Sequence, residues 1–183
     1  MAKRSIVKNA VHLVLWLLIL GVVGQAADSA LIDFEMKDQF EHEHRTADWR
    51  GDVLLLIGSD QNGSQFDAVW EQAIRDSVPG LVDTGSLRVV HVADVRGVPF
   101  FLKGVVRRKF PDDTANPIIL DWKGEFATTY GFESDKANIL VFDRKALLQH
   151  QVAVAGIDSN KLDELTDELV ALLGRPGKNE DAE

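Results

Sequence analysis

Residues 53–70 read VLLLIGSDQNGSQFDAVW, and this stretch decides the fold. It opens with a continuous apolar run from Val53 to Ile57, which is typical of a central strand covered on both faces. Turn residues follow, and from Phe66 onward apolar side chains recur at helical spacing. Ser64 is the expected N-cap of that helix. A buried strand that leads through a turn into an amphipathic helix predicts an α/β fold.

The same alternation of strand and helix patterns continues along the chain. The charged stretch 37–50 suits an exposed hairpin or loop. We expect further strands over 87–92, 117–120, 139–142 and 147–154, a helix opening at Pro99, a short helical piece ending at Tyr130, and a last helix capped by Asp158 or Ser159 and ending at Gly174. This order predicts a mixed central sheet with helices on both faces, in one domain over residues 31–173.

Most aromatic and apolar side chains are expected in the core, and two tryptophans beside turns are the exceptions. In the helix that opens at Pro99 the inward residues are expected to be Phe101, Leu102, Val105 and Val106. Phe66, Trp70 and Phe100 are also expected to pack in the core, and His91 to be a hydrogen-bonded core histidine. Trp49 and Trp122 lie beside turns and are candidates for exposed aromatic anchors.

The N-terminus has the three parts of a secretory signal. Three basic residues precede an apolar run over 10–23, and small residues follow at Gly24 and Ala26. We expect residues 1–26 to be a signal peptide and the protein to be periplasmic or secreted. The alternative is an uncleaved membrane anchor over 10–27 that leaves the domain outside the cytoplasm. At the other end, residues 174–183 are expected to form a disordered acidic tail.

The net charge limits the possible partners. The 183 residues carry a formal charge of −9, and removing the three basic residues Lys3, Arg4 and Lys8 changes it to −12. So acidic a surface repels phosphate backbones and anionic lipid headgroups, which argues against nucleic-acid binding. Association with a membrane is expected only if the N-terminal segment stays uncleaved.

The element order, with a late antiparallel hairpin and a closing helix, resembles the thioredoxin fold with its three layers. Phe34–Gln39 followed by Trp49–Leu56 is similar to the opening of redoxins and of peroxiredoxins of the alkyl-hydroperoxide-reductase class. Ile119–Ala127 and Ile139–Arg144 are similar to later motifs of the same proteins. Within this superfamily the chain most resembles the YtfJ family of small periplasmic proteins, which have a signal peptide and no conserved cysteine pair.

The chain departs from this resemblance at the redox site. Asn62, Gly63, Ser64 and Gln65 lie about where the family has its Cys-X-X-Cys motif, and Ala137 lies where the fold has its cis-proline. The peptide at Ala137 is expected to be trans, because non-proline cis bonds cost several kcal/mol. The chain has no cysteine, and disulfide exchange requires a thiolate. Thiol chemistry is therefore excluded, and no catalytic residue of the family can be transferred.

Two main functional hypotheses remain. The first is a non-catalytic module of the cell envelope that binds a protein, a peptide or a small ligand at the degenerate active-site edge, formed by Asn62, Gly63, Ser64, Gln65, Ala137 and Asn138. The second is an enzyme with non-thiol chemistry that uses Ser64 or the pair His42 and His44. A third reading is that the chain is a redoxin or peroxiredoxin by ancestry alone.

Cofactor and metal sites are not expected. His42 and His44 are weak candidates for metal ligands, because two imidazoles define little spacing and lie in a charged stretch. The basic cluster of Lys103, Arg107, Arg108 and Lys109 could receive an acidic partner, although such clusters are by default the solvated face of a helix.

Overall fold

The computed structural model describes residues 29–80 and 87–174. The expected signal peptide over 1–26, the alternative anchor over 10–27 and the expected tail beyond Gly174 lie outside these ranges. Within them, the structure contains no helix with both the length and the apolar character needed to span a bilayer.

The strands form one main sheet and a small hairpin. They are β1 (Glu35–Lys37), β2 (Glu43–Arg45), β3 (Val53–Ser59), β4 (Leu87–Asp94), β5 (Ile118–Asp121), β6 (Ala137–Phe142) and β7 (Leu148–Val154). The main sheet has the order β5-β4-β3-β6-β7, with β3, β4 and β5 parallel and β6 and β7 antiparallel. The antiparallel pair β1-β2 begins two residues before the stretch 37–50 that was expected to form a hairpin or loop.

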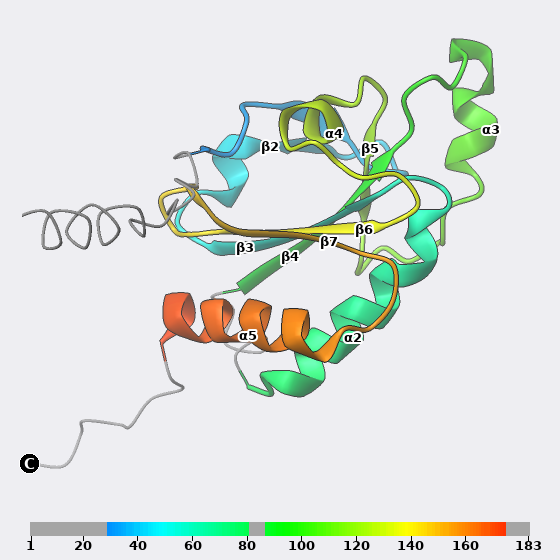
Figure 1. Cartoon of the computed structure of the whole chain (residues 1–183). Helices are drawn as coiled ribbons and strands as arrows, with labels where there is room; N and C mark the ends of the chain where they lie inside the picture. The colour runs from blue at the N-terminus through cyan, green and yellow to red at the C-terminus, as the bar shows by residue number, and fades with distance from the viewer. Residues whose placement is uncertain (1–28, 81–86, 175–183) are drawn as a thin grey trace, which may run out of the picture.

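The helices lie on both faces of the main sheet. They are α2 (Asp67–Ser77), α3 (Lys103–Arg107), α4 (Glu125–Thr129) and α5 (Ser159–Leu173), with short 3-10 helices η1 (Thr46–Trp49), η2 (Gly63–Phe66) and η4 (Phe100–Leu102). Figure 1 shows α2 and α5 on one face and α4 with the β1-β2 hairpin on the other. Asp158 caps α5 as expected, since its side chain accepts from two backbone N–H groups. The predicted mixed sheet between helical layers is confirmed.

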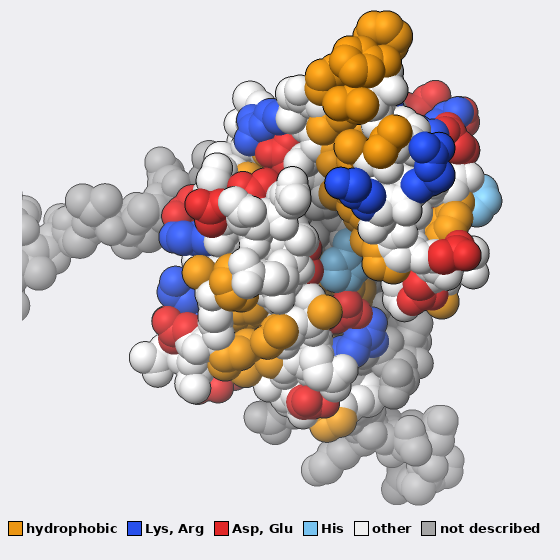
Figure 2. Space-filling view, turned by 90° about the vertical axis from the view of Figure 1, so that its right-hand side faces the viewer, with side chains coloured by type: hydrophobic (Ala, Val, Ile, Leu, Met, Phe, Trp, Pro, Cys, Tyr) orange, Lys and Arg blue, Asp and Glu red, His pale blue; other side chains and the backbone are white. Residues whose placement is uncertain are grey.

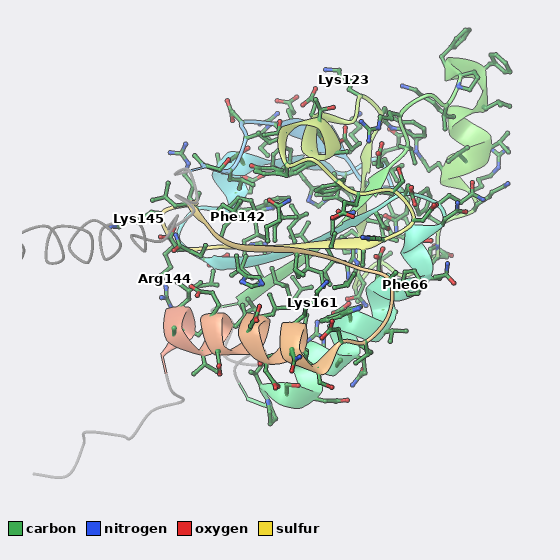
Figure 3. All side chains as sticks on the ribbon, viewed as in Figure 1. Phe66, Lys123, Phe142, Arg144, Lys145 and Lys161 are labelled. Carbon is green, nitrogen blue, oxygen red and sulfur yellow. The ribbon has the colours of Figure 1, made fainter. Side chains whose placement is uncertain are left out.

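Strand β3 supplies the core of both layers because successive side chains point to opposite faces. Leu55 and Ile57 pack with α2 and α5, whereas Leu54 and Leu56 pack with α4. Each of these side chains is at most 2% exposed. Figure 3 shows side chains filling the space on both sides of the sheet, with Phe142 on the side of α4. The continuous apolar run thus reflects burial on two faces.

The β1-β2 hairpin covers the outer edge of β5. Asp38 forms an antiparallel bridge with Ile119. Next to it, the Gln39 carboxamide accepts a hydrogen bond from the backbone N–H of Ile118 at 2.7 Å and donates one to the carbonyl of Pro111 at 3.3 Å. A side chain therefore completes the pairing that a further strand would otherwise provide.

The inward orientation expected for the helix after Pro99 is wrong. Phe101 is 68% exposed, Leu102 40% and Val105 44%, and Phe100, also expected in the core, is 83% exposed. The helical pattern was recognised, but α3 stands away from the sheet (Figure 1), and among the residues that the structure describes nothing buries these side chains. An amphipathic pattern indicates which side of a helix is apolar and not whether the chain itself covers that side.

Two expectations about tryptophan are also corrected. Trp49, expected to be exposed, is only 4% exposed and packs against Phe34 with ring centroids 4.7 Å apart. Trp122 is half-buried, with the Lys103 ammonium 4.8 Å from its ring centroid. Trp70, by contrast, is fully buried as expected.

Substitutions in β3 and η4 should differ in cost. Leu56→Ala removes a fully buried side chain and should lower the free energy of unfolding by about 2–5 kcal/mol. Leu102→Ala should change it by about 0.5 kcal/mol or less, because the side chain already contacts solvent. Chemical denaturation of both variants checks this, and equal losses would contradict the exposure of the segment.

Candidate functional site

The loop before α2 meets the loop before β6, as the thioredoxin resemblance implies. A Cβ atom added at Gly63 would overlap the carbonyl group of Lys136, so the two backbones touch. Gly63 is itself buried, and only a residue without a side chain fits there. The degenerate active-site edge is thus assembled from residues far apart in the sequence.

Carboxylates of the two loops tie them together. Asp60 Oδ1 accepts from the backbone N–H of Gly63 at 2.8 Å, and Asp60 Oδ2 accepts from the backbone N–H of Asp135 at 3.0 Å. Asp135 Oδ1 in turn accepts from the Asn62 amide at 2.7 Å. Neither aspartate was identified from the sequence. Asp60 had a local signal, since an aspartate side chain in a turn often accepts a hydrogen bond from the backbone two residues on, as Asp60 Oδ1 does from the N–H of Asn62 at 3.1 Å.

Ala137 and Asn138 lie beneath this surface and do not line it. They are 0% and 2% exposed, and both belong to β6 between β3 and β7. The Asn138 amide donates to the carbonyls of Gly58, Glu133 and Lys136, and its oxygen accepts from the backbone N–H of Glu133. Asn138 therefore holds the loop before β6 in place. No peptide bond of the described residues is cis, as expected at Ala137.

Ser64 does not cap the helix, which corrects the sequence prediction. Its hydroxyl donates to the carbonyl of Gln61 at 2.9 Å, and the first α-helical residue is Asp67, three positions further on. The intervening residues form η2, where the Gln65 amide donates to the carbonyl of Asn62 at 2.7 Å. No base contacts the Ser64 hydroxyl among the described residues, so its environment does not make it a nucleophile.

A partly buried carboxylate lies behind the edge. Asp67 Oδ2 accepts a short hydrogen bond of 2.6 Å from the Ser59 hydroxyl, while Oδ1 is buried without a hydrogen-bond partner. Burial raises the pKa of Asp67 to about 6, although the Ser59 hydrogen bond acts in the opposite direction. The pairing joins the end of β3 to the start of α2. Sequence spacing alone does not predict it, because the two residues come from different elements.

His91 is a hydrogen-bonded histidine at the margin of the core, as expected. Its Nε2 lies 2.7 Å from Glu71 Oε2, and its side chain is 16% exposed. The His91 hydrogen bond, helped by Arg75 and opposed by burial, lowers the pKa of Glu71 to about 2. The histidine is thus engaged by α2 and makes no recorded contact with Ser64.

His42 and His44 both approach the buried carboxylate of Asp38. The His44 Nε2 lies 3.0 Å from Asp38 Oδ2, and the His42 Nδ1 lies 3.3 Å from the same oxygen. Burial raises the pKa of Asp38, but the hydrogen bonds from His44 and from the backbone of His42 and Phe40 outweigh it and hold the pKa below its usual value. Across residues 29–80 and 87–174, no three His, Asp or Glu side chains are placed to hold a metal ion. The histidine pair thus serves the β1-β2 hairpin.

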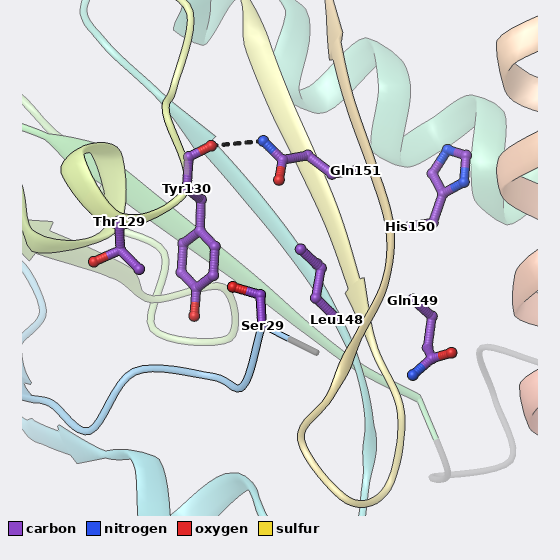
Figure 4. A pocket seen from close by; sticks show the side chains of 7 residues that line it. All are labelled: Ser29, Thr129, Tyr130, Leu148, Gln149, His150 and Gln151. Carbon is purple, nitrogen blue, oxygen red and sulfur yellow. Dashed lines mark hydrogen bonds between the residues drawn. The ribbon is translucent and has the colours of Figure 1, made fainter. Parts of the chain in front are cut away.

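Two hollows of the surface lie away from this edge. One, of about 380 Å³, is lined by Ser29, Thr129, Tyr130 and residues 148–151. Figure 4 shows its lining, with the Gln151 amide donating to the carbonyl of Tyr130 at 2.6 Å. The other, of about 460 Å³, lies between residues 32–33 and 123–129. Neither includes a residue of the degenerate active-site edge.

Comparison with known proteins identifies the fold. No family model matches the chain, and no curated protein does. Among solved structures, the chain is similar to the exposed lipoprotein thioredoxin Etrx1 of Streptococcus pneumoniae, at 18% identity and a TM-score of 0.56, over 77% of this chain and 100% of that one. A putative thiol:disulfide interchange protein DsbE from Chlorobium tepidum gives 16% identity and a TM-score of 0.57, over 80% and 97%.

A third similar structure is a putative thioredoxin from Neisseria meningitidis, with 16% identity and a TM-score of 0.52, over 86% of this chain and 95% of that one. At these identities the likeness establishes the fold alone. The chain has the thioredoxin-like fold, and it has no cysteine.

The raised pKa of Asp67 predicts a pH-dependent effect of Asp67→Asn. The folded state favours the protonated acid, so this contribution to stability is complete below the ordinary aspartate pKa of 3.8 and is lost as pH rises through about 6. Asparagine stays neutral, so at pH near 8 the variant should be more stable than the parent by up to about 3 kcal/mol. Denaturation at pH near 8 and near 4 measures this difference.

The gain should fall to a small fraction of this value near pH 4, because Asp67 is then protonated in the folded state and close to half protonated in the unfolded state. The matched control is Asp167→Asn, at an exposed position of α5, which should show no such pH-dependent gain. A gain of equal size at both pH values would contradict the role of burial at Asp67.

Proposed function

We propose that this chain is a redox-degenerate thioredoxin-fold protein that binds a protein or peptide partner in the cell envelope and catalyses no thiol chemistry. The observation that carries the proposal is the state of the degenerate active-site edge. Asn62 and Gln65 occupy the ends of the motif where the fold has its reactive pair, and their amides are hydrogen-bonded to Asp135 and to the backbone. This edge offers hydrogen-bonding groups and no nucleophile.

The arrangement of the edge favours binding. Gln61, Asn62, Ser64 and Gln65 are exposed, as are residues 133–135 across from them. Beneath them, the buried Asn138 and the Asp60 carboxylate hold both loops. A surface whose backbone is fixed before a partner arrives loses little conformational entropy on binding. The partner we propose is an extended segment or a loop that hydrogen-bonds to these exposed polar groups.

The alternative of an enzyme with non-thiol chemistry lacks support from the geometry. Ser64, His91 and His42 each hydrogen-bond to a different partner, namely Gln61, Glu71 and Asp38. Catalysis by a hydroxyl requires a base within hydrogen-bonding reach of it.

The proposal also includes a family within the thioredoxin-like fold and a location for the protein. We place the chain among redoxin-like proteins that lack cysteines, most similar to the YtfJ family, with residues 1–26 as a signal peptide and a periplasmic or secreted domain. The motifs over 119–127 and 139–144 and the basic, apolar and small residues of the N-terminus support it.

Restoring the cysteines tests whether the edge is a degenerate redox site. Asn62→Cys with Gln65→Cys should form an internal disulfide and reduce insulin disulfides measurably, because both positions lie in the turn that begins the helix, where thiol pKa values fall. The parent chain should show no activity above buffer. The control pair Ala68→Cys with Gln72→Cys, exposed on α2, should remain inactive. A folded but inactive Asn62/Gln65 pair would contradict the assignment.

Site-specific photocrosslinking tests partner binding. A photoreactive phenylalanine analogue at Gln61 should give an adduct of defined mass in cells that export the protein, whereas the same analogue at Asp167 on α5 should not. Asp60→Ala removes the carboxylate that orients both loops, so it should abolish the adduct. Asp76→Ala, at an exposed position of α2, should retain it. Identical adducts at Gln61 and Asp167 would argue against this edge.

A further inference from the structure

A second surface lies at the α3 tip, which we define as residues 100–109. Its apolar side chains are Phe100, Phe101, Leu102 and Val105, with exposures of 83%, 68%, 40% and 44%. The two phenylalanine rings contact each other edge to face, with centroids 5.7 Å apart. Figure 2 shows hydrophobic side chains gathered on a projection at this end of the molecule. Apolar side chains on a convex projection contact solvent unless something else covers them.

The charge of the α3 tip is opposite to that of the chain. Residues 100–109 contain Lys103, Arg107, Arg108 and Lys109 and no acidic residue, in a chain of net charge −9. Two of these cations have partners, since Arg107 pairs with Glu41 and Lys103 lies over Trp122. Arg108 and Lys109 are exposed and form no ion pair with any residue that the structure describes. Free positive charge therefore borders the exposed phenylalanines.

We propose that the α3 tip inserts into the interface of an anionic lipid bilayer. Aromatic and aliphatic side chains on such a projection can enter the boundary between headgroups and acyl chains. Basic side chains beside them meet lipid phosphates, and each contributes about 1 kcal/mol near the surface. Acidic residues that lie farther from the α3 tip than a Debye length, about 8 Å in physiological salt, are largely screened from the lipid surface.

The small size of the α3 tip favours a bilayer over a protein partner. A stable protein interface buries about 800 Å² on each side. The apolar side chains of the α3 tip are two phenylalanines of about 150–250 Å² each and the partly covered Leu102 and Val105, so its apolar area alone falls short of that total. Interfacial insertion has no such threshold, because its strength grows with the buried area and the electrostatic attraction. The inference does not depend on the degenerate active-site edge.

The absence of cysteine makes a local test possible in the full chain. Gly104→Cys introduces one thiol at the α3 tip, where a Cβ atom would have only the Arg108 guanidinium at 3.9 Å. The thiol is labelled with an environment-sensitive fluorophore, and Ala68→Cys on α2 carries the same label as a control. A fluorophore reports only on its own surroundings. Insertion of the apolar N-terminal segment into a bilayer therefore does not by itself change the emission of a label at position 104.

Vesicles of phosphatidylcholine alone and vesicles half of phosphatidylglycerol are then added. The label at position 104 should shift to the blue and become protected from aqueous iodide with the anionic vesicles only. The label at position 68 should not respond to either. A label at position 104 that stays water-exposed, or equal responses at both positions, would overturn the proposal.

Matched variants on the Gly104→Cys background separate the contribution of the basic side chains from that of the apolar side chains. Arg108→Glu with Lys109→Glu should raise the lipid concentration for half of the response at least about thirty-fold, as expected for losing two phosphate contacts. Arg144→Glu with Lys145→Glu, a basic pair at the opposite end of the molecule (Figure 3), should have little effect. If the two charge reversals act equally, the α3 tip is not the contact.

The apolar contribution has its own pair of variants. Phe100→Ser with Phe101→Ser should raise the same lipid concentration at least about ten-fold. Val69→Ser with Ile157→Ser, two apolar positions that are each 50% exposed elsewhere, should leave it unchanged. Circular dichroism confirms that each variant is folded, and a folded Phe100/Phe101 variant that responds like the parent would overturn insertion.

Discussion

The burial of β3 on both faces and along both edges is the constraint on which the rest of the structure depends. Its side chains reach both core layers, and β4 and β6 pair with its two sides. The last residues of β3 also contact the loops at the surface. Gly58 lacks the side chain that would overlap the Phe132 ring, its carbonyl accepts from Asn138, and Ser59 reaches Asp67 at the start of α2. The two loops of the degenerate active-site edge are therefore both held by the end of one central strand.

Most of the fold could be predicted from the sequence because its signals are local. The run from Val53 to Ile57 and the Asp158 cap depend on neighbours in the chain, and both are present in the structure. The predictions that were wrong concerned side chains whose burial depends on packing against parts of the chain that are distant in sequence. Trp49 follows a charged hairpin, and only the tertiary structure brings Phe34 against it. The α3 pattern was recognised, but its exposure depends on where the helix stands relative to the sheet.

The position of the degenerate active-site edge could be predicted from the sequence. Which of its residues are buried and what they hydrogen-bond to could not. The resemblance identified Asn62–Gln65 and Ala137–Asn138, and the structure brings these segments together at Gly63 and Lys136. The resemblance did not indicate that Asn138 is buried and that its amide holds the adjacent loop. Hydrogen bonds such as Ser59 to Asp67 join elements whose relative position no sequence pattern encodes. Polar residues at a recognised site can thus serve as its support as well as its surface.

The Gln39 amide at the outer edge of β5 has a consequence for how the domain behaves in a crowded compartment. An unpaired edge strand is a template on which other extended chains can add and grow into aggregates. Here the carboxamide occupies the N–H of Ile118, and the bridge between Asp38 and Ile119 covers the adjacent position. A chain that reaches this edge must first displace part of the protein itself. The hairpin therefore shields this edge of the sheet from pairing with other extended chains.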